Sequence, residues 1–422
     1  IQNHALLKQL EEYQANHGCV VEMETKTGHV KAISNLGRSE DGSYYETVNY
    51  AVTESHEPGS TFKLVDMIAL LDDNKIDTSK VYDTQGGIIT YYGRKVRDSH
   101  EGGYGRISLA RGFEVSSNTV LVQAVYENYK NNPKEFVDRI DRMGLNKPLG
   151  LPFKGEGKPF IPQPNESTWS GLALPWMAYG YGVSVTPLQT LALYNAIANN
   201  GEMIKPQFVS EIKEWNKTIK KYNKEVINPK ICSDETIKKL KAIMQNVVKK
   251  GTASKLYSKD FSMAGKTGTA AANYGANGGA DKYYISSFVG FFPVEKPKYS
   301  CIVVVHKPNT SKNNYYGADV AGPVFKRIAQ KIFTDAPSTN EIKSLNKKVY
   351  KQEKAYQDYY SMVSLNKKTL PNLKGMPGMD AVALLENMKI KVKVIGVGKV
   401  KKQSIQPGES LAKIKSITLE LS

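Results

Sequence analysis

Three short motifs follow one another along the chain: Ser60-Thr61-Phe62-Lys63, Ser116-Ser117-Asn118 and Lys266-Thr267-Gly268-Thr269. Each motif is weak alone, because other S-x-x-K, S-x-N and K-T-G sequences occur elsewhere in the chain. Only this set places a serine at the start of a predicted helix, a polar cluster between two predicted helices and a lysine on a predicted strand. That combination is typical of serine acyl-transfer enzymes that use a lysine as the base.

The first motif pairs a candidate nucleophile with a candidate base. Glu57-Pro58-Gly59 interrupts the preceding segment, and the apolar run after it predicts a helix over residues 61–71. Ser60 then lies at the helix N-terminus, where free N–H groups favour developing negative charge, and Lys63 shares its face. The alternative is a capping serine followed by a surface lysine. A helix that is apolar almost all round favours a buried lysine, which loses its proton easily and would accept the Ser60 hydroxyl proton.

The second motif lies between two predicted helices. The Ser116 hydroxyl could relay a proton to a leaving group, and the Asn118 amide could hold a peptide group of the substrate. The alternative is that both residues only cap a helix that begins near Thr119. Taken alone, the residues favour the capping interpretation.

The third motif lies in a predicted strand that is rich in small residues. Gly265 and Gly268 leave room for a ligand backbone to approach, so an extended peptide could add to this strand. The side chains expected to face a substrate carboxylate are those of Lys266, Thr267 and Thr269. The backbone N–H groups of Ser60 and Thr269 would form an oxyanion hole, which is worth ~10²–10³ in rate.

Two competing interpretations of K-T-G sequences fail. A phosphate-binding loop that ends at Lys266 needs a glycine at position 260, and that position is Asp260. The second K-T-G copy, Lys26-Thr27-Gly28, falls between two apolar runs and predicts the turn of a β-hairpin.

Longer stretches around these motifs resemble the class B penicillin-binding proteins, the peptidoglycan D,D-transpeptidases of the cell-division or sporulation type. The similar stretches are ESHEPGSTFKLV (54–65), AYGYGVSVTPLQTLALYNAIANNG (178–201), YISSFVGFFP (284–293) and YYGADVAGPVF (315–325). The similarity spans about residues 15–335. It implies an α/β (α+β) penicillin-recognising fold, in which an antiparallel sheet flanked by helices carries the K-T-G strand and a helical subdomain carries Ser60.

The resemblance also implies a function. Ser60 would be the nucleophile, Lys63 the base and Ser116 a proton relay, while Asn118 and the segment Lys266-Thr267-Gly268-Thr269 would bind substrate. The substrate would be a stem peptide ending in D-Ala-D-Ala, and β-lactams would acylate Ser60 as mimics of it. No cofactor is expected. The expected protein partners are a membrane-embedded glycosyltransferase and other division or elongation proteins.

Residues 370–422 resemble a PASTA module, one helix on a small sheet. An amphipathic segment, Asp380 to Asn387, precedes alternating apolar runs at 391–394 and 417–421. The resemblance implies contact with peptidoglycan or with the catalytic domain, and a passive packing module is the alternative. The predicted organisation is therefore a transpeptidase domain over 1–335, a linker over 336–369 and a PASTA domain over 370–422.

Composition restricts the class of partner. The 58 basic and 41 acidic residues give a formal charge of +17, which suits an acidic envelope polymer or lipid headgroups. The lysines are scattered and no basic-aromatic motif occurs, so nucleic acid is not an expected partner. No stretch approaches 18 apolar residues. The resemblance implies the extracytoplasmic face of the bacterial cytoplasmic membrane, with an N-terminal anchoring helix that this chain does not include.

Cysteine and histidine spacing indicates no metal site. The three cysteines lack C-x-x-C spacing, and histidines 4, 17, 29, 56, 100 and 306 show no metal-ligand pattern. Two alternative functions remain open. A hydrolytic relative, a D,D-carboxypeptidase or β-lactamase, would share all three motifs. A β-lactam or muropeptide sensor would be acylated at Ser60 without turnover.

Overall fold

The computed structural model describes residues 1–215, 217–274, 281–312, 314–335 and 368–422. It divides into two compact units, Ile1–Ala336 and Pro337–Ser422, and each unit has its own hydrophobic core. Most of the predicted linker, residues 336–367, lies outside the described residues. Within the described residues, no helix is both long and apolar enough to cross a membrane.

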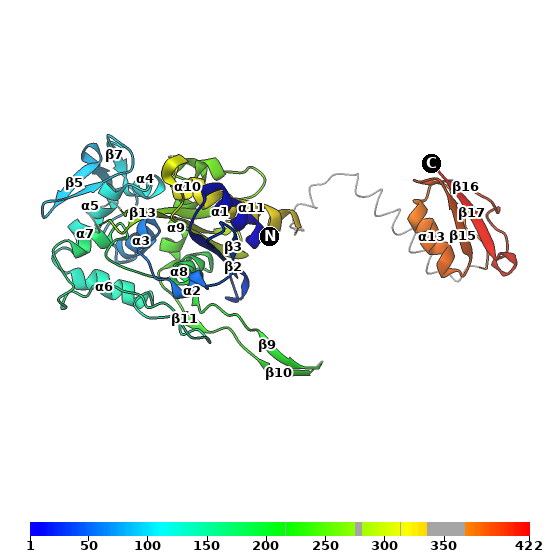
Figure 1. Ribbon diagram of the computed structural model, residues 1–422, viewed down its shortest axis with the longest axis horizontal. Helices are drawn as coiled ribbons and strands as arrows, with labels where there is room; N and C mark the ends of the chain where they lie inside the picture. The colour runs from blue at the N-terminus through cyan, green and yellow to red at the C-terminus, as the bar shows by residue number, and fades with distance from the viewer. Residues whose placement is uncertain (216, 275–280, 313, 336–367) are drawn as a thin grey trace. The chain divides into compact units, whose positions relative to one another are not determined.

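The first unit is built on a six-stranded antiparallel sheet (Figure 1). In spatial order, its strands are β12 (Ala264–Ala272), β13 (Tyr283–Phe292), β14 (Tyr299–His306), β1 (His17–Glu24), β2 (Val30–Arg38) and β3 (Tyr44–Tyr45). The central strands β14 and β1 are apolar and almost entirely buried, because helices cover both faces of the sheet. Strand β12, which carries the K-T-G motif, lies at one edge.

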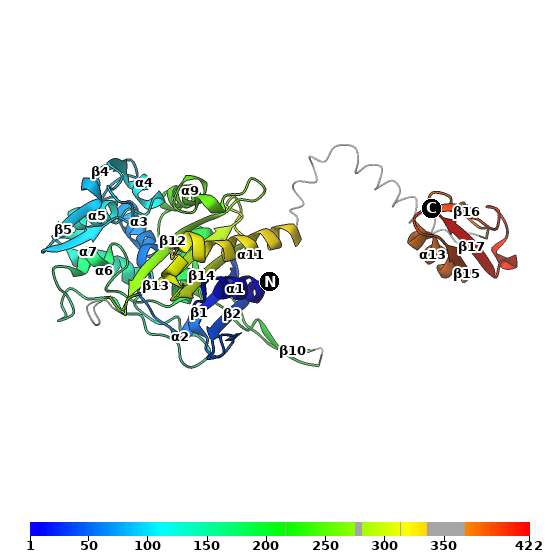
Figure 2. The same cartoon turned by 45° about the horizontal axis from the view of Figure 1, so that its top comes forward.

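Different helices cover the two faces of the sheet. Helices α1 (Gln2–Tyr13) and α11 (Gly322–Asp335) pack on one face, as Figure 2 shows. Helix α8 (Pro187–Ala198) packs on the other face and is buried at every residue, which explains why it is apolar all round. Its start is fixed by a capping box between Thr186 and Gln189.

A helical part lies beside the sheet and carries the first two motifs. Its helices are α3 (Lys63–Asp72), α4 (Leu109–Glu114), α5 (Asn118–Tyr129), α6 (Pro133–Arg142), α7 (Ala173–Met177) and α9 (Asp234–Lys250). The short helix α2 (Tyr50–Thr53) precedes them in the chain, and the short helix α10 (Gly317–Val320) packs on β12 and β13. Short 3₁₀ turns are η1 (Gly59–Thr61), η2 (Gln85–Gly87), η3 (Ser254–Leu256) and η5 (Thr310–Lys312).

Four two-stranded ribbons complete the first unit. They pair β4 (Val81–Asp83) with β7 (Arg106–Ser108), β5 (Ile88–Tyr91) with β6 (Arg94–Arg97), β8 (Met203–Ile204) with β11 (Val226–Asn228), and β9 (Glu211–Glu214) with β10 (Lys217–Lys221). The β9–β10 hairpin projects away from the body of the unit in both views (Figures 1 and 2).

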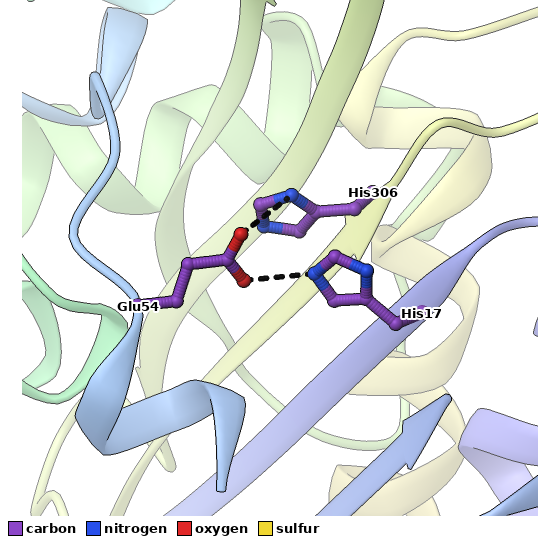
Figure 3. A group of neighbouring side chains, drawn as sticks. All are labelled: His17, Glu54 and His306. Atoms are coloured by element: carbon purple, nitrogen blue, oxygen red, sulfur yellow. Dashed lines mark hydrogen bonds and ion pairs between the residues drawn. The ribbon is translucent and has the colours of Figure 1, made fainter. Parts of the chain in front are cut away.

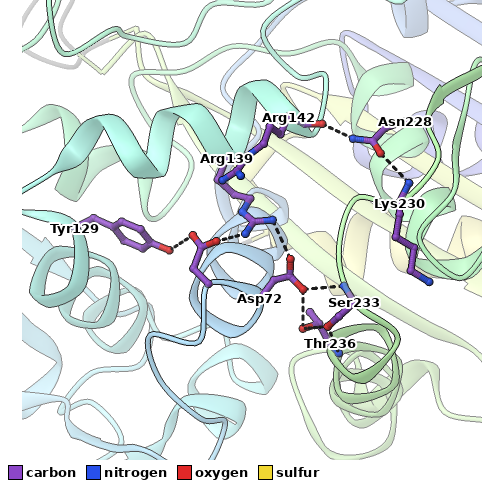
Figure 4. Close-up of polar contacts among 9 residues, drawn as sticks. Asp72, Tyr129, Arg139, Arg142, Asn228, Lys230, Ser233 and Thr236 are labelled. Carbon is purple, nitrogen blue, oxygen red and sulfur yellow. Dashed lines mark hydrogen bonds and ion pairs between the residues drawn. The ribbon is translucent and has the colours of Figure 1, made fainter.

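Polar contacts fix the end of the helix that follows Ser60 (Figure 4). The Arg139 guanidinium on α6 pairs with Asp72 at 2.9 Å and also with Asp73. Asp72 accepts a further hydrogen bond from the backbone N–H of Ser233, the residue that caps α9. Tyr129 on α5 donates its hydroxyl to Asp73. Helices α3, α5, α6 and α9 are thereby joined at one point.

The second unit consists of one helix and a three-stranded sheet. Its elements are α13 (Gly378–Asn387), β15 (Lys391–Ile395), β16 (Val400–Gln403), the 3₁₀ turn η7 (Leu411–Lys413) and β17 (Ser416–Leu421). Strand β17 is central, parallel to β15 and antiparallel to β16. The predicted amphipathic helix and both predicted apolar strands are present.

Most predicted elements of the first unit are also confirmed. Lys26-Thr27-Gly28 lies in the turn between the antiparallel strands β1 and β2, and Lys266 lies in β12. The predicted start of the first helix needs correction. The α-helix begins at Lys63 rather than at residue 61, and Ser60 lies in the preceding 3₁₀ turn η1.

Candidate active site

The three motifs meet where the edge strand β12 faces η1 and the turn between α4 and α5. Gly59 packs so closely on β12 that an added Cβ would lie 3.1 Å from the Cβ of Ala270. At Gly268 an added Cβ would lie 2.2 Å from Ser287 Oγ and 2.9 Å from Thr61 Cγ2. Only glycine lets the strand and the Ser60 turn approach this closely.

Lys63, three residues after Ser60, is fully buried. Its Nζ atom donates to the Ser116 carbonyl oxygen at 2.7 Å, to Asn118 Oδ1 at 2.6 Å and to Ser116 Oγ at 3.3 Å. Burial lowers the pKa of Lys63 to about 7, although the charges of Asp98 and Asp66 oppose this shift. A large fraction of Lys63 is therefore neutral near pH 7 and able to accept a proton.

Ser116 joins the two lysines of the site. Its Oγ atom accepts from Lys266 Nζ at 2.8 Å and from Lys63 Nζ at 3.3 Å. Its backbone is left-handed, with φ of 59°, a conformation that costs a non-glycine residue roughly 1–3 kcal/mol and is frequent at functional sites. The structure therefore holds this hydroxyl between two amines at the expense of backbone strain.

The interpretation of Ser116 and Asn118 as helix caps is wrong. Helix α5 begins at Asn118, and the capping residue is Ser117, whose Oγ accepts from the Val120 N–H. Asp98 supports this start, because its carboxylate accepts from Ser117 and from the backbone and hydroxyl of Thr119. With the capping role taken by Ser117, the side chains of Ser116 and Asn118 are directed to Lys63.

The side chains of the third motif make more contacts within the protein than the sequence suggests. Lys266 is fully buried, and burial, followed by the charge of Lys63, holds its pKa well below the usual range. The Thr267 hydroxyl lies 2.7 Å from Thr252 Oγ1, and Thr269 Oγ1 accepts from the Gly317 N–H at 3.0 Å. In this structure Lys266 contacts Ser116, so the expected carboxylate-binding role of these side chains is untested by the geometry.

The free edge of β12 defines a place for an extended ligand. The Ala271 N–H donates to the Tyr181 hydroxyl at 2.8 Å, on the side away from β13. Because alternate residues of a strand direct their backbone groups to the same side, the N–H and C=O of Thr269 also point to this edge. Tyr181 thus covers the edge of β12 at Ala271, beyond Thr269.

Several residues around the site were not assigned roles from the sequence. Tyr181 is one, and Glu57 is another, since its carboxylate accepts from the Gly182 N–H and from the Tyr274 hydroxyl. Asp98 and Thr252 also lie outside the three motifs. The stretch 178–201 was the available signal for Tyr181, but it indicated only a resemblance, because nothing local in the sequence links it to β12.

Two protein-family models match the chain. The family model described as penicillin binding protein transpeptidase domain matches residues 18–330, and the PASTA domain model matches residues 368–422. Stage V sporulation protein D of Bacillus subtilis is 28% identical over 430 residues, covering 97% of this chain and 62% of that protein. The probable peptidoglycan D,D-transpeptidase PbpC of Pseudomonas aeruginosa is 27% identical, covering 77% of this chain and 55% of that protein.

Solved structures show the same fold. The transpeptidase domain of Burkholderia pseudomallei penicillin-binding protein 3 superposes with a TM-score of 0.66 at 24% identity, covering 79% of this chain and 92% of that one. Mycobacterium tuberculosis penicillin-binding protein 3, complexed with aztreonam, gives a TM-score of 0.68 at 24% identity, covering 79% and 76%. Because the family model spans most of the chain, the protein belongs to the penicillin-binding-protein transpeptidase-domain family and carries a PASTA domain after it.

Proposed function

We propose that the chain is a serine-type peptidoglycan D,D-transpeptidase that cross-links stem peptides ending in D-Ala-D-Ala. One observation carries the proposal: the amines of Lys63, three residues after Ser60, and of Lys266 converge on the Ser116 hydroxyl. The relatives named peptidoglycan D,D-transpeptidase support it. The chain spans less than two thirds of the length of the first curated relatives that it matches.

The first half-reaction forms an ester on Ser60. Ser60 Oγ attacks the carbonyl carbon of the penultimate D-alanine, and its proton passes to the neutral amine of Lys63. The N–H groups of Ser60 and Thr269 stabilise the negative oxygen of the tetrahedral intermediate. When the C–N bond breaks, Ser116 passes a proton to the leaving amine of the terminal D-alanine.

The second half-reaction transfers the acyl group. An amine from a neighbouring stem peptide attacks the Ser60 ester, loses a proton to the Lys63–Ser116 pair, and Ser60 leaves with its hydroxyl restored. The substrate peptide adds along the free edge of β12. In this proposal Asn118 holds the acyl peptide, while Lys266, Thr267, Gly268 and Thr269 form the carboxylate side of the site. No cofactor takes part.

The organisation of the whole protein is also a proposal. Residues 1–335 form the transpeptidase domain, 336–369 the linker and 370–422 the PASTA domain. The protein acts on peptidoglycan at the extracytoplasmic face of the cytoplasmic membrane, anchored by an N-terminal helix. Its protein partners are a membrane-embedded glycosyltransferase and other division or elongation proteins, and β-lactams acylate Ser60 in place of the stem peptide.

Labelling with a fluorescent penicillin tests the nucleophile. The wild-type chain acquires one covalent adduct, which peptide mass spectrometry places on Ser60, and Ser60→Ala abolishes it. Ser210→Ala is the matched control, because Ser210 begins another S-x-x-K sequence on the exposed surface and should label normally. An adduct on Ser210 or Ser410 would refute the assignment of the site.

The lifetime of the penicilloyl adduct and an assay of peptide transfer distinguish a transpeptidase from a β-lactamase and from a sensor. A transpeptidase keeps the penicilloyl ester for many minutes, because water lacks a general-base contribution worth ~10²–10⁴. It also joins a D-Ala-D-Ala donor peptide to an amine acceptor. Rapid nitrocefin turnover would instead support a β-lactamase, and a stable adduct without any peptide transfer would support a sensor.

A further inference from the structure

Two histidines and a glutamate meet on the sheet, outside the machinery described above (Figure 3). His17 begins β1 and His306 ends β14, and the two residues are directly paired across these strands. Their side chains therefore leave the same face of the sheet. Glu54 follows the short helix α2 and directs its carboxylate to both rings. In the part of the chain that the structure describes, no other cluster of this kind occurs.

The distances between the donor atoms of these three residues suit binding of one shared metal ion. His17 Nε2 lies 2.8 Å from Glu54 Oε2, and His306 Nδ1 lies 3.6 Å from Glu54 Oε1. All three residues place a donor atom within 4.8 Å of the other two. Around a tetrahedral zinc ion with bonds of about 2.0–2.2 Å, neighbouring donor atoms lie about 3.3–3.5 Å apart. The donor atoms of the cluster lie between 2.8 Å and at most 4.8 Å apart, a range that includes these separations.

The second nitrogen of His17 is also arranged as in a metal-binding histidine. His17 Nδ1 lies 2.7 Å from the amide oxygen of Asn16, which can only accept, so Nδ1 carries the proton. In the neutral ring, Nε2 then presents its lone pair to the carboxylate of Glu54. Either a proton or a metal ion can lie between Nε2 and this carboxylate, and a neighbouring acceptor that fixes the tautomer is the usual support of a metal ligand.

A third imidazole stands next to the cluster. The His56 ring packs edge-on against His306 with centroids 5.1 Å apart. The residue is half-buried, and its Nδ1 atom, which is itself shielded from solvent, has no hydrogen-bond partner within the described residues. A buried imidazole nitrogen without a partner is costly, and a ligand ion would remove that cost. Tyr50 stacks on the other side of His17 at 4.1 Å and fixes that ring.

We propose that the chain binds one Zn²⁺ ion through His17 Nε2, the Glu54 carboxylate and His306 Nδ1. The fourth position is filled by water or by a rotated His56. The ion would join β1, β14 and the segment that leads from Glu54 to Ser60, so its role is to stabilise this segment. The sequence predicted no metal site because the ligands come from three distant segments. The proposal is independent of the transpeptidase reaction.

Titration of the full chain with Zn²⁺ tests this site. Protein stripped with a chelator and titrated in competition with a chromogenic zinc indicator should bind one equivalent. Glu54→Gln and His17→Gln should each weaken zinc binding by at least about tenfold, since each substitution removes a side-chain atom that binds the ion directly. His29→Gln is the matched control, because His29 also faces a glutamate, Glu24, at 3.8 Å and should leave binding unchanged.

Two outcomes would overturn the proposal. One is wild-type protein that binds less than one equivalent, and the other is equal affinity in Glu54→Gln, His17→Gln and wild type. If the variants fail to fold, X-ray absorption of the zinc-loaded wild type decides. Two or three imidazole nitrogens with carboxylate oxygen at about 2.0–2.2 Å support the site, and sulfur or purely oxygen ligation refutes it. Penicillin labelling of Ser60 is scored separately, so failure of the metal site leaves the proposed enzyme standing.

Discussion

At the scale of single residues, burial decides which protonation states the site can use. Lys63 and Lys266 lie close enough that both are linked to one hydroxyl, and two buried ammonium groups at this distance repel each other. Lys266 therefore has its pKa lowered by Lys63 as well as by burial. In the proposed mechanism, this coupling allows a proton to pass between the amines and Ser116.

The pKa of Lys63 predicts how acylation depends on pH. Because burial lowers this pKa to about 7, the amine is mostly protonated below pH 7 and mostly neutral above it. The rate constant for acylation by a penicillin should rise with pH through about 7 and then level off. Stopped-flow acylation from pH 5 to 9 measures this.

A variant without the amine sharpens the same test. Lys63→Met should slow acylation by roughly 10⁴-fold, since a coupled nucleophile and base act as one unit. Lys213→Met is the control, because Lys213 ends the other S-x-x-K sequence on the surface and should leave the profile unchanged. A flat pH profile in the wild type would exclude Lys63 as the base.

Asp66 is a second buried ionisable group, one helical turn beyond Lys63. Both carboxylate oxygens lack a hydrogen-bond partner within the described residues, and burial holds the pKa of Asp66 well above its usual range. A carboxyl whose folded pKa exceeds its unfolded pKa binds protons more tightly in the folded state. Its contribution to stability is therefore complete below the unfolded pKa and is lost as pH rises through the folded pKa.

This sign predicts a stabilising substitution. At pH 8, Asp66→Asn should raise the free energy of unfolding by about 1–3 kcal/mol, because the buried carboxyl must take up a proton on folding and the neutral amide need not. At pH 4 the difference should be smaller. Urea denaturation at both pH values measures it, with exposed Asp260→Asn as the control. A less stable variant at pH 8 would mean that Asp66 is ionised and satisfied in the folded protein.

Residue spacing identified the side chains of the three motifs as site residues, but it did not identify the other side chains that surround them in the fold. Ser60 and Lys63 lie one turn apart, so local geometry alone places them together. Asp98 and Tyr181 reach the site only because the chain returns to it after long intervals. Such contacts depend on the packing of distant segments, and a single sequence carries no local pattern for them.

At the scale of elements, helix and strand identities followed from periodicity, whereas their exact ends depended on side-chain competition. Both Ser116 and Ser117 can cap a helix. Ser117 takes this position because Asp98 holds its hydroxyl, and Ser116 is left in a left-handed conformation. Asp98, about twenty residues upstream, therefore decides which serine caps the helix and which one faces Lys63.

The helix that follows Ser60 is anchored at its far end by Arg139. Arg139→Met leaves the carboxylates of Asp72 and Asp73 without their cation in a largely buried setting. Removing one partner of a fully buried pair costs more than removing a surface one, so we expect a loss of about 2–3 kcal/mol here. Chemical denaturation measures the loss, and Lys134→Met in the exposed Lys134–Asp138 pair of the same helix is the control. Equal effects of the two variants would contradict an anchoring role.

At the scale of the whole molecule, each of the two units contains its own core. All proposed catalytic and substrate-binding residues lie before residue 270, within the first unit. The second core consists of about ten buried apolar side chains contributed by α13, its sheet and the adjoining loops. A module of about fifty residues with such a core is marginally stable by itself. The sequence predicted this division through the resemblance of residues 370–422 to a PASTA module, and length and composition agreed with it.

Truncation tests whether the PASTA domain takes part in acylation. A protein that ends at Asp335 keeps helix α11, the last element of the first unit, and the residues to which Lys63 and Lys266 donate hydrogen bonds. It should fold and be acylated by the same β-lactam at nearly the rate of the full chain. Side-by-side measurement of the two acylation rate constants decides this, with circular dichroism to confirm folding. A large fall in rate for the folded, truncated protein would mean that the C-terminal unit shapes the site, and the boundary proposed at residue 335 would then be wrong.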